Sequence, residues 1–316
     1  WLKQSRLLAA MPRCSGPVTA VACAPELGCI VAGDSGGKIT VFDATTGDVR
    51  QEMQCDAAVS SVACAPELRA VVSAEGSMAK GLYRVTIWDA ATGERRTEVD
   101  YDHYVSAVIY VAELQAVASG DGGFTTSDKH LGRVVAWNAE TGEQHLRLVC
   151  KGAVVSLAYC PGEGAIASGD RSGAVVLWDA RTGAKRLEVP CSSPAAPAAF
   201  LPCSLAYCPE ARSIVCGLAN FQGRCGQVAL WDARSGEQRF MLECDGAVTS
   251  VAWVPAAQAV VSGDRSGRLV LWDLEARARR LEVACGGPVN AVAYSAGTNA
   301  AVSGDKTGAV TTWPLP

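Results

Sequence analysis

Ser35 lies in a run of small residues, 33–37, which reads Gly-Asp-Ser-Gly-Gly and could present a nucleophilic hydroxyl. A serine nucleophile needs a histidine base held in place by a carboxylate. The three histidines, His103, His130 and His145, lie in no phrase that suggests such a base. Equivalent phrases elsewhere read Gly-Asp-Arg-Ser-Gly and Gly-Asp-Lys-Thr-Gly, which indicates a turn. We therefore predict no catalytic residue and no enzymatic activity.

The 14 cysteines are the other residues whose type could carry chemistry. No CxxC pair is present and the histidines show no ligand spacing, so we predict no metal site. Six cysteines recur at one register of a repeat: Cys14, Cys55, Cys150, Cys191, Cys244 and Cys285. Equivalent positions in neighbouring repeats should lie beyond the ~7 Å between Cα atoms that a disulfide allows. Buried, reduced thiols in a reducing compartment are the prediction, and Cys216 and Cys225 are the pair that could approach each other.

A repeated phrase organises the whole chain: an apolar run, an aromatic residue, a polar residue and a turn ending near Thr-Gly-Glu. The aromatic positions are Phe42, Trp88, Trp137, Trp178, Trp231, Trp272 and Trp313, at intervals of 41 to 53 residues. Within residues 245–285 the pattern predicts four strands, a to d, over 248–254, 259–262, 268–272 and 279–285. Apolar content falls from strand a to strand d, as expected from the centre of a ring to its rim.

These features together resemble the WD40-repeat family over the full length of the chain. The resemblance rests on the Trp-Asp pairs, the Ser-Gly-Asp phrase before strand c and the period. It implies an all-β, seven-bladed β-propeller of four-stranded antiparallel blades in a single domain, 1–316. The repeats run roughly over 15–55, 56–101, 102–150, 151–191, 192–244, 245–285 and 286–316.

The sequence also departs from that family. No Gly-His dipeptide precedes strand a, and Ser266 and Thr307 stand where the family has an Asp before strand c. The resemblance therefore implies that the family's buried Asp-His-Ser-Trp network does not form in its usual way. Phrases such as residues 43–48 also resemble those of quinoprotein propellers, which place a docking Trp after the phrase. Here the aromatic residue comes before it, so no quinone or other cofactor is predicted.

The last repeat has strands a, b and c but no strand d. Residues 1–14 end at the register of the strand-d cysteines, so we expect residues 6–14 to pair with residues 308–313 and close the ring. Pro12 is compatible with such an edge strand. The alternative is that residues 1–14 end a preceding repeat of a longer protein, because the chain opens on Trp1 and not on Met.

All length variation falls in two kinds of loop. The b–c loops of repeats two, three and five and the d–a loop before repeat five are lengthened, and both kinds should open on one face. Insertions gathered on one face of a repeat ring are typical of a binding face. Tolerated loop drift is the alternative. The predicted partner-binding residues are Lys80, Tyr83, Phe124, Lys129, His130, Phe200, Phe221 and Arg224.

A ring of acids, Asp34, Glu75, Asp121, Asp170, Asp264 and Asp305, lies beside these loops, and we interpret it as caps of the b–c turns. The loops' basic residues favour an acidic protein or peptide partner. A net charge of −4 argues against nucleic acid, and no apolar run is long enough to span a membrane.

We therefore expect a monomeric, non-catalytic protein-interaction scaffold in the cytoplasm, with the nucleus left open. Two alternatives remain: an enzyme or small-ligand binder at the channel mouth, and a regulatory end of a larger protein.

Overall fold

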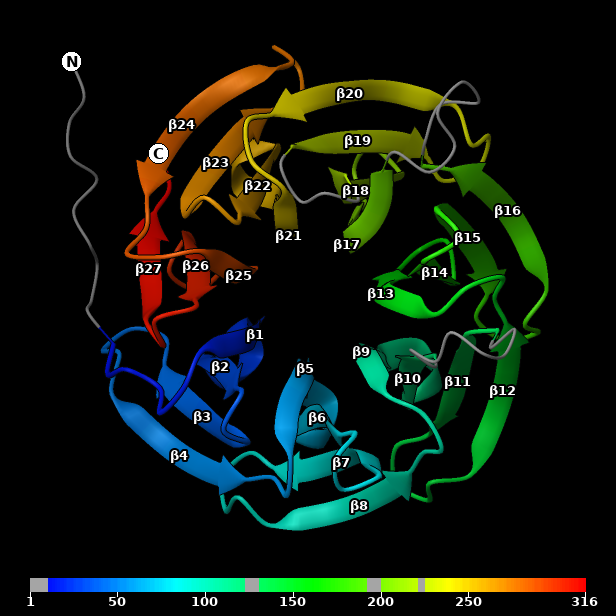
Figure 1. Ribbon diagram of the computed structural model, residues 1–316, viewed down its shortest axis with the longest axis vertical. Helices are drawn as coiled ribbons and strands as arrows, with labels where there is room; N and C mark the ends of the chain where they lie inside the picture. Colours follow the sequence, from blue (N-terminus) through cyan, green and yellow to red (C-terminus); the bar gives the residue numbers. More distant parts are fainter. Residues whose placement is uncertain (1–10, 123–130, 192–199, 221–224) are drawn as a thin grey trace.

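Seven antiparallel sheets stand around a central channel in the computed structural model (Figure 1). The structure describes residues 11–122, 131–191, 200–220 and 225–316. Within these residues six sheets have four strands and the seventh has three. The predicted seven-bladed, all-β propeller is confirmed.

Each blade is a meander whose first strand, a, lines the channel and whose last strand, d, lies at the rim (Figure 1). Blade one contains β1 (Val18–Ala24), β2 (Cys29–Asp34), β3 (Lys38–Asp43) and β4 (Val49–Gln54). Blade two contains β5 (Ala58–Ala65), β6 (Ala70–Ser77), β7 (Leu82–Asp89) and β8 (Arg95–Asp100). Blade three contains β9 (Val105–Val111), β10 (Ala116–Asp121), β11 (Arg133–Asn138) and β12 (Gln144–Val149). Blade four contains β13 (Val154–Cys160), β14 (Ala165–Asp170), β15 (Ala174–Asp179) and β16 (Lys185–Pro190).

The remaining blades follow the same order. Blade five contains β17 (Phe200–Cys208), β18 (Ser213–Asn220), β19 (Gly226–Asp232) and β20 (Gln238–Cys244). Blade six contains β21 (Val248–Val254), β22 (Ala259–Asp264), β23 (Arg268–Asp273) and β24 (Ala278–Ala284), within two residues of the predicted bounds. Blade seven contains β25 (Val289–Ser295), β26 (Ala300–Asp305) and β27 (Val310–Pro314). Short 3-10 turns link strands a and b in four blades: η1 (Pro25–Leu27), η2 (Pro66–Leu68), η3 (Ala112–Leu114) and η4 (Pro255–Ala257).

The core lies between the blades, because each apolar cluster joins residues of two neighbouring sheets. The strand-c tryptophans are buried there, and their indole N–H groups donate to serines on strand b at 2.8 Å. These pairs are Trp88 with Ser73, Trp178 with Ser168, Trp272 with Ser262 and Trp313 with Ser303. The thiols of Cys55, Cys150 and Cys285 contact the same serines, at 3.8–3.9 Å. A Cys–Ser–Trp network thus forms, and the recurring cysteines take a defined place in it.

The exceptions to this network follow the sequence. Blade one has Phe42 on strand c and Ala32 at the serine position, so donor and acceptor are both absent. In blade three Tyr101 replaces the recurring cysteine, and its hydroxyl bonds both Ser119 and the indole of Trp137. A buried polar group costs free energy when it lacks a partner, which explains why donor and acceptor are absent together in blade one. All 14 cysteines are free thiols, including Cys216 and Cys225.

Closure of the ring involves the start of the described chain. The Cys14 N–H donates to the Gly308 carbonyl at 2.9 Å, and Met11 packs in a cluster with Phe42 and Val310. Residues 6–10 of the predicted closing strand lie outside the described residues, so that pairing stays a prediction.

Deleting residues 1–14 should leave the outer edge of β27 unpaired and expose the Met11 contact site. We expect lower thermal stability and aggregation, because open strand edges template association. Size-exclusion chromatography and a thermal melt measure both effects. A truncated protein that stays monomeric with an unchanged melting temperature would contradict the closing role.

Candidate functional site

Two faces of the ring are defined by backbone hydrogen bonds between loops. The b–c turns bond the d–a loops, as Ser35 N to Pro17 O and Lys306 N to Pro288 O show, both near 3.0 Å. We call this side the loop face. The c–d turns bond the a–b turns, as in Ala44 N to Gly28 O at 3.0 Å, and we call that side the turn face. The β6–β7 hairpin, the lengthened loop that the structure describes in full, therefore lies on the loop face; the other inserted segments, 123–130, 192–199 and 221–224, lie outside the described residues.

Three of the eight predicted partner-binding residues lie within the described chain. Lys80 is exposed at the tip of the β6–β7 hairpin, and its Nζ donates to the Asp56 carbonyl at 2.8 Å. Tyr83 is half-buried and meets Tyr104 edge to face, with 6.3 Å between ring centroids. Phe200 is also half-buried and packs against the core between blades four and five. This contact places its ring at the start of β17, and its role in binding stays a prediction. Phe124, Lys129, His130, Phe221 and Arg224 lie outside the described residues.

Exposed apolar side chains gather on the loop face. Met78 on the β6–β7 hairpin is 70% exposed, Leu131 before β11 is 52% exposed, and Val149 at the end of β12 is 54% exposed. Among the described residues the one other large apolar side chain so exposed is Val49, on the turn face, at 39%. Sequence reasoning missed these three positions, because a single apolar residue in a loop gives no periodic signal. Large apolar side chains kept in water on one face are typical of an interaction surface.

The buried carboxylates of the b–c turns serve as caps, as predicted. Asp34 Oδ1 accepts from Gly36 N and Lys38 N at 2.8 and 2.9 Å, and its Oδ2 accepts from Ser15 Oγ at 2.6 Å. Asp170, Asp264 and Asp305 are bonded in the same way, and Asp121 is paired with Arg133. These groups are therefore occupied and do not form an open binding site.

Glu75 in blade two breaks that pattern. It is fully buried, its Oε2 accepts from Ala57 N at 2.8 Å, and its Oε1 has no hydrogen-bond partner. The β6–β7 ladder continues regularly to Ser77 and Leu82, so no turn N–H is available to cap the second oxygen. Burial raises the pKa of Glu75 above its ordinary value.

Glu75→Gln should stabilise the protein increasingly as pH rises. A raised pKa in the folded state means that Glu75 favours folding below its unfolded pKa and loses that contribution as pH rises through the folded pKa. The neutral amide avoids this loss, so we expect a gain of about 1 kcal/mol at pH 8 and little gain at pH 4. Denaturant melts at both pH values measure the difference. Glu67→Gln, at an exposed position of the same blade, is the control and should change stability little at either pH. An equal gain for Glu75→Gln at both pH values would contradict this account.

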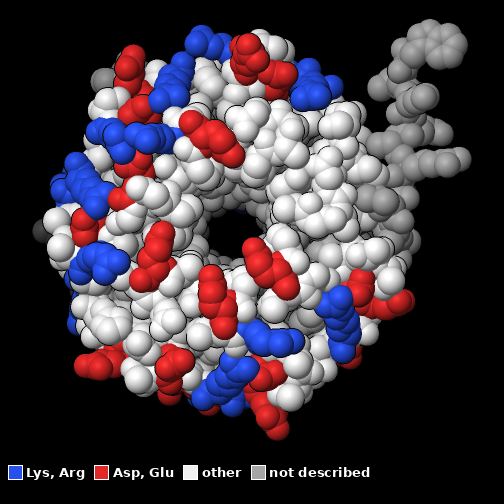
Figure 2. All heavy atoms as spheres, turned by 180° about the vertical axis from the view of Figure 1, so that it is seen from behind, with Lys and Arg blue, Asp and Glu red and all other residues white. Residues whose placement is uncertain are grey.

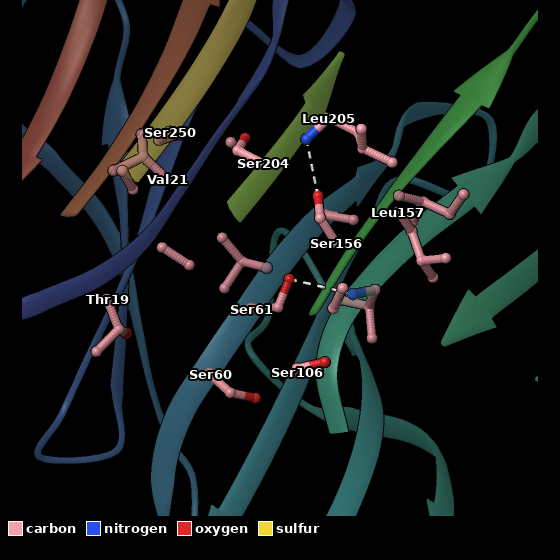
Figure 3. Close-up of a pocket in the computed structure, with 18 of the residues that line it drawn as sticks. Thr19, Val21, Ser60, Ser61, Ser106, Ser156, Leu157, Ser204, Leu205 and Ser250 are labelled. Carbon is pink, nitrogen blue, oxygen red and sulfur yellow. Dashed lines mark hydrogen bonds between the residues drawn. The ribbon is translucent and has the colours of Figure 1, made fainter. Parts of the chain in front are cut away.

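The channel holds a cavity of about 430 Å³ lined by strands a of all seven blades (Figure 3). No charged side chain is among its described lining residues. Side chains at one register donate to carbonyls of the next blade at 2.6–2.7 Å: Ser60 to Val105, Thr249 to Val289 and Asn290 to Val18. One residue farther along, serine hydroxyls accept from N–H groups of the next blade at 2.9–3.1 Å. Figure 3 shows the bonds to Ser61 from Val108 and to Ser156 from Leu205. Ser204 accepts from Val251 in the same way. The polar groups of the channel thus hold the blades together.

Ion pairs occupy the turn face (Figure 2). In four blades the aspartate that ends strand c caps the c–d turn and also binds an arginine of strand d, with Asp43–Arg50 and Asp232–Arg239 at 2.5 Å. The bonds from Thr46 N, Arg50 and Thr45 N lower the pKa of Asp43 to about 2. Acidic side chains also lie round much of the channel mouth on this face (Figure 2). The a–b turns of blades one, two and three each contribute one acidic residue: Glu26, Glu67 and Glu113.

The family model described as outer membrane protein assembly factor BamB matches residues 70–282, more than half of the chain. The chain belongs to this family. The match confirms a propeller and does not extend to the WD40 family specifically. A search of curated proteins finds no match.

The described residues contain no group of three or more His, Cys, Asp or Glu side chains placed to hold a metal ion. A carboxylate-bearing quinone would need cations, and the described channel lining offers none, so the channel does not fit such a group. Within the described segments no helix is long and apolar enough to cross a membrane.

Proposed function

We propose that this propeller is a non-catalytic interaction platform that binds a protein or peptide partner on the loop face. The observation that carries the proposal is the exposure of Met78, Leu131 and Val149 on blades two and three. Apolar side chains with neighbouring aromatic residues, here Tyr83 and Tyr104, form the central contacts of many interfaces. The lengthened b–c loop of blade two, the β6–β7 hairpin, carries Met78 on the same face.

An acidic partner is the finer part of the proposal. Exposed cations occupy the residue after the capping aspartate in three b–c turns: Arg171, Arg265 and Lys306. The aspartates beneath them are bonded by backbone N–H groups, so the cations form the outer layer of the turns. Exposed Lys80 extends this layer to blade two. A partner with carboxylates would meet these groups first.

Membership of the WD40 family and an intracellular location are also proposals. The bonds from Trp272 to Ser262 and from Trp313 to Ser303 support the first, because the resemblance implies a Trp–Ser contact. The 14 free thiols support the second. Mass spectrometry of the native protein, alkylated without prior reduction, tests the intracellular location. Several disulfides would place the protein in an oxidising compartment.

The channel is the alternative location for binding. Its cavity is large enough for a small ligand, but its hydroxyl and amide side chains already bond the neighbouring blades. A ligand there would have to use the remaining lone pairs of those groups, so we favour the loop face.

Affinity capture from an extract of the source cells tests the proposal. The wild-type chain is compared with a variant in which Asn-Gly replaces residues 78–81 of the β6–β7 hairpin. Asn-Gly is a favoured two-residue turn. A partner retained by the wild type and lost by the shortened hairpin supports the loop face. Equal recovery by both proteins would contradict it.

A further inference from the structure

A small cavity opens between blades one and two on the turn face. Its volume is about 190 Å³. Cys29, the first residue of β2, lies in its wall together with two arginines, Arg50 and Arg69. Arg50 is held in place by Asp43 and by the Leu27 carbonyl, which accepts from its Nη1 at 2.7 Å. A thiol is thus fixed in a cleft beside cationic groups.

The second thiol of this site comes from the next blade. Cys64, near the end of β5, packs against the core cluster that contains Cys29 and also lines the central channel. Both thiols thus belong to one apolar packing region between blades one and two. Cys29 is only 3% exposed, so a small reagent can reach it through the cavity, whereas a large one cannot.

This environment differs from that of the recurring cysteines. The neighbouring Cys64 thiol and the charge of Arg50 lower the pKa of Cys29, although burial opposes them. Burial instead raises the pKa of Cys55 to about 12 and that of Cys150 to about 11. The thiolate is the reactive form of cysteine, and nearby cations favour it. Cys29 has this setting, because it lines the cavity together with Arg50 and Arg69.

We propose that Cys29 and Cys64 form a hydroperoxide-sensitive dithiol that links blades one and two when it is oxidised. The Cys29 thiolate attacks the distal oxygen of the peroxide, the O–O bond breaks, and the leaving alkoxide or hydroxide takes a proton to give an alcohol or water. Cys29 is then a sulfenic acid. The Cys64 sulfur attacks it, the S–O bond breaks, and water leaves with the Cys64 proton. Two thiols are oxidised to one disulfide and one peroxide is reduced.

Arg50 has a defined role in this proposal as a positioning residue. Its guanidinium stabilises the thiolate and the negative oxygen that leaves during attack. Blade four offers a matched comparison, because Arg186 binds Asp179 and the Glu163 carbonyl as Arg50 binds Asp43 and the Leu27 carbonyl. Ala165 stands there at the position of Cys29, so Arg186 has no thiol to activate.

The test uses the full, reduced chain treated with a small molar excess of hydrogen peroxide. Remaining thiols are alkylated in denaturant, and the chain is cut with trypsin, Glu-C and Asp-N. Cleavage at Glu26 separates Cys23 from Cys29, and cleavage at Asp56 separates Cys55 from Cys64. We expect a Cys29–Cys64 disulfide as the main product. In Cys64→Ser a dimedone adduct should appear on Cys29, and Cys23→Ser should behave as the wild type.

The arginine variants supply the rate test. Arg50→Gln should slow disulfide formation by about fivefold or more, and Arg186→Gln should leave it unchanged. Three results would overturn the proposal: a Cys29–Cys23 link, recovery of Cys29 as a free thiol while exposed Cys225 is oxidised, or equal rates in the two arginine variants. The wild-type mapping decides the pairing even where a variant folds poorly.

Discussion

Replacing Trp272 with Ala should lower the free energy of unfolding by about 3–5 kcal/mol. The side chain is 3% exposed in the cluster between blades five and six, and its indole N–H donates to Ser262 at 2.8 Å. Truncation therefore leaves a large cavity and a buried serine without its donor. Urea melts followed by circular dichroism measure the loss.

The chain supplies its own control for this variant. Phe42 occupies the same register in blade one, opposite Ala32. Trp272→Phe combined with Ser262→Ala copies that arrangement. This double variant should keep most of the stability that Trp272→Ala loses. A loss below about 1 kcal/mol for Trp272→Ala would contradict the packing role assigned to the strand-c aromatics.

The second large effect concerns binding. Changing Met78, Leu131 and Val149 together to Ser should weaken binding of the captured partner by more than about 2 kcal/mol, which is roughly 30-fold in Kd. Stability should change little, because all three side chains are more than half exposed. The three loop residues Phe124, Lys129 and Phe221, changed together to Ala, should have a similar effect. Titration calorimetry with the purified partner measures both.

Two controls place matched changes on the turn face. Val49→Ser removes an exposed apolar side chain of the turn face, and Glu94, Glu143 and Glu237 changed together to Ala remove exposed charges of the c–d turns. Neither change should weaken binding of the partner. If these controls lose affinity while the loop-face variants keep it, the partner binds on the turn face and the proposal is wrong.

Much of the fold could be predicted from the aromatic register alone. The seven recurring aromatic positions from Phe42 to Trp313 predicted the blade count, and the pattern around Trp272 predicted all four strands of blade six within two residues. The shared face of the b–c and d–a loops followed from the meander. These features repeat seven times, so each repeat supports the interpretation of the others.

Features that occur once could not be predicted in this way. The unpaired oxygen of Glu75 depends on a hairpin that continues its ladder past the usual turn. The pairing of Cys29 with Cys64 joins different registers of neighbouring blades, which sequence spacing does not reveal. Phe200 was expected to be an exposed contact residue, yet it packs on the core because β17 begins there.

Hydrogen exchange of the propeller with and without its captured partner tests the central claim most directly. The proposal predicts slower exchange at the β6–β7 tip, residues 77–82, and around residues 131–133 on the loop face. The a–b turns, including Pro25–Leu27 and Pro66–Leu68, should exchange at unchanged rates. Protection confined to those turns, or to the strands that line the channel, would contradict binding on the loop face.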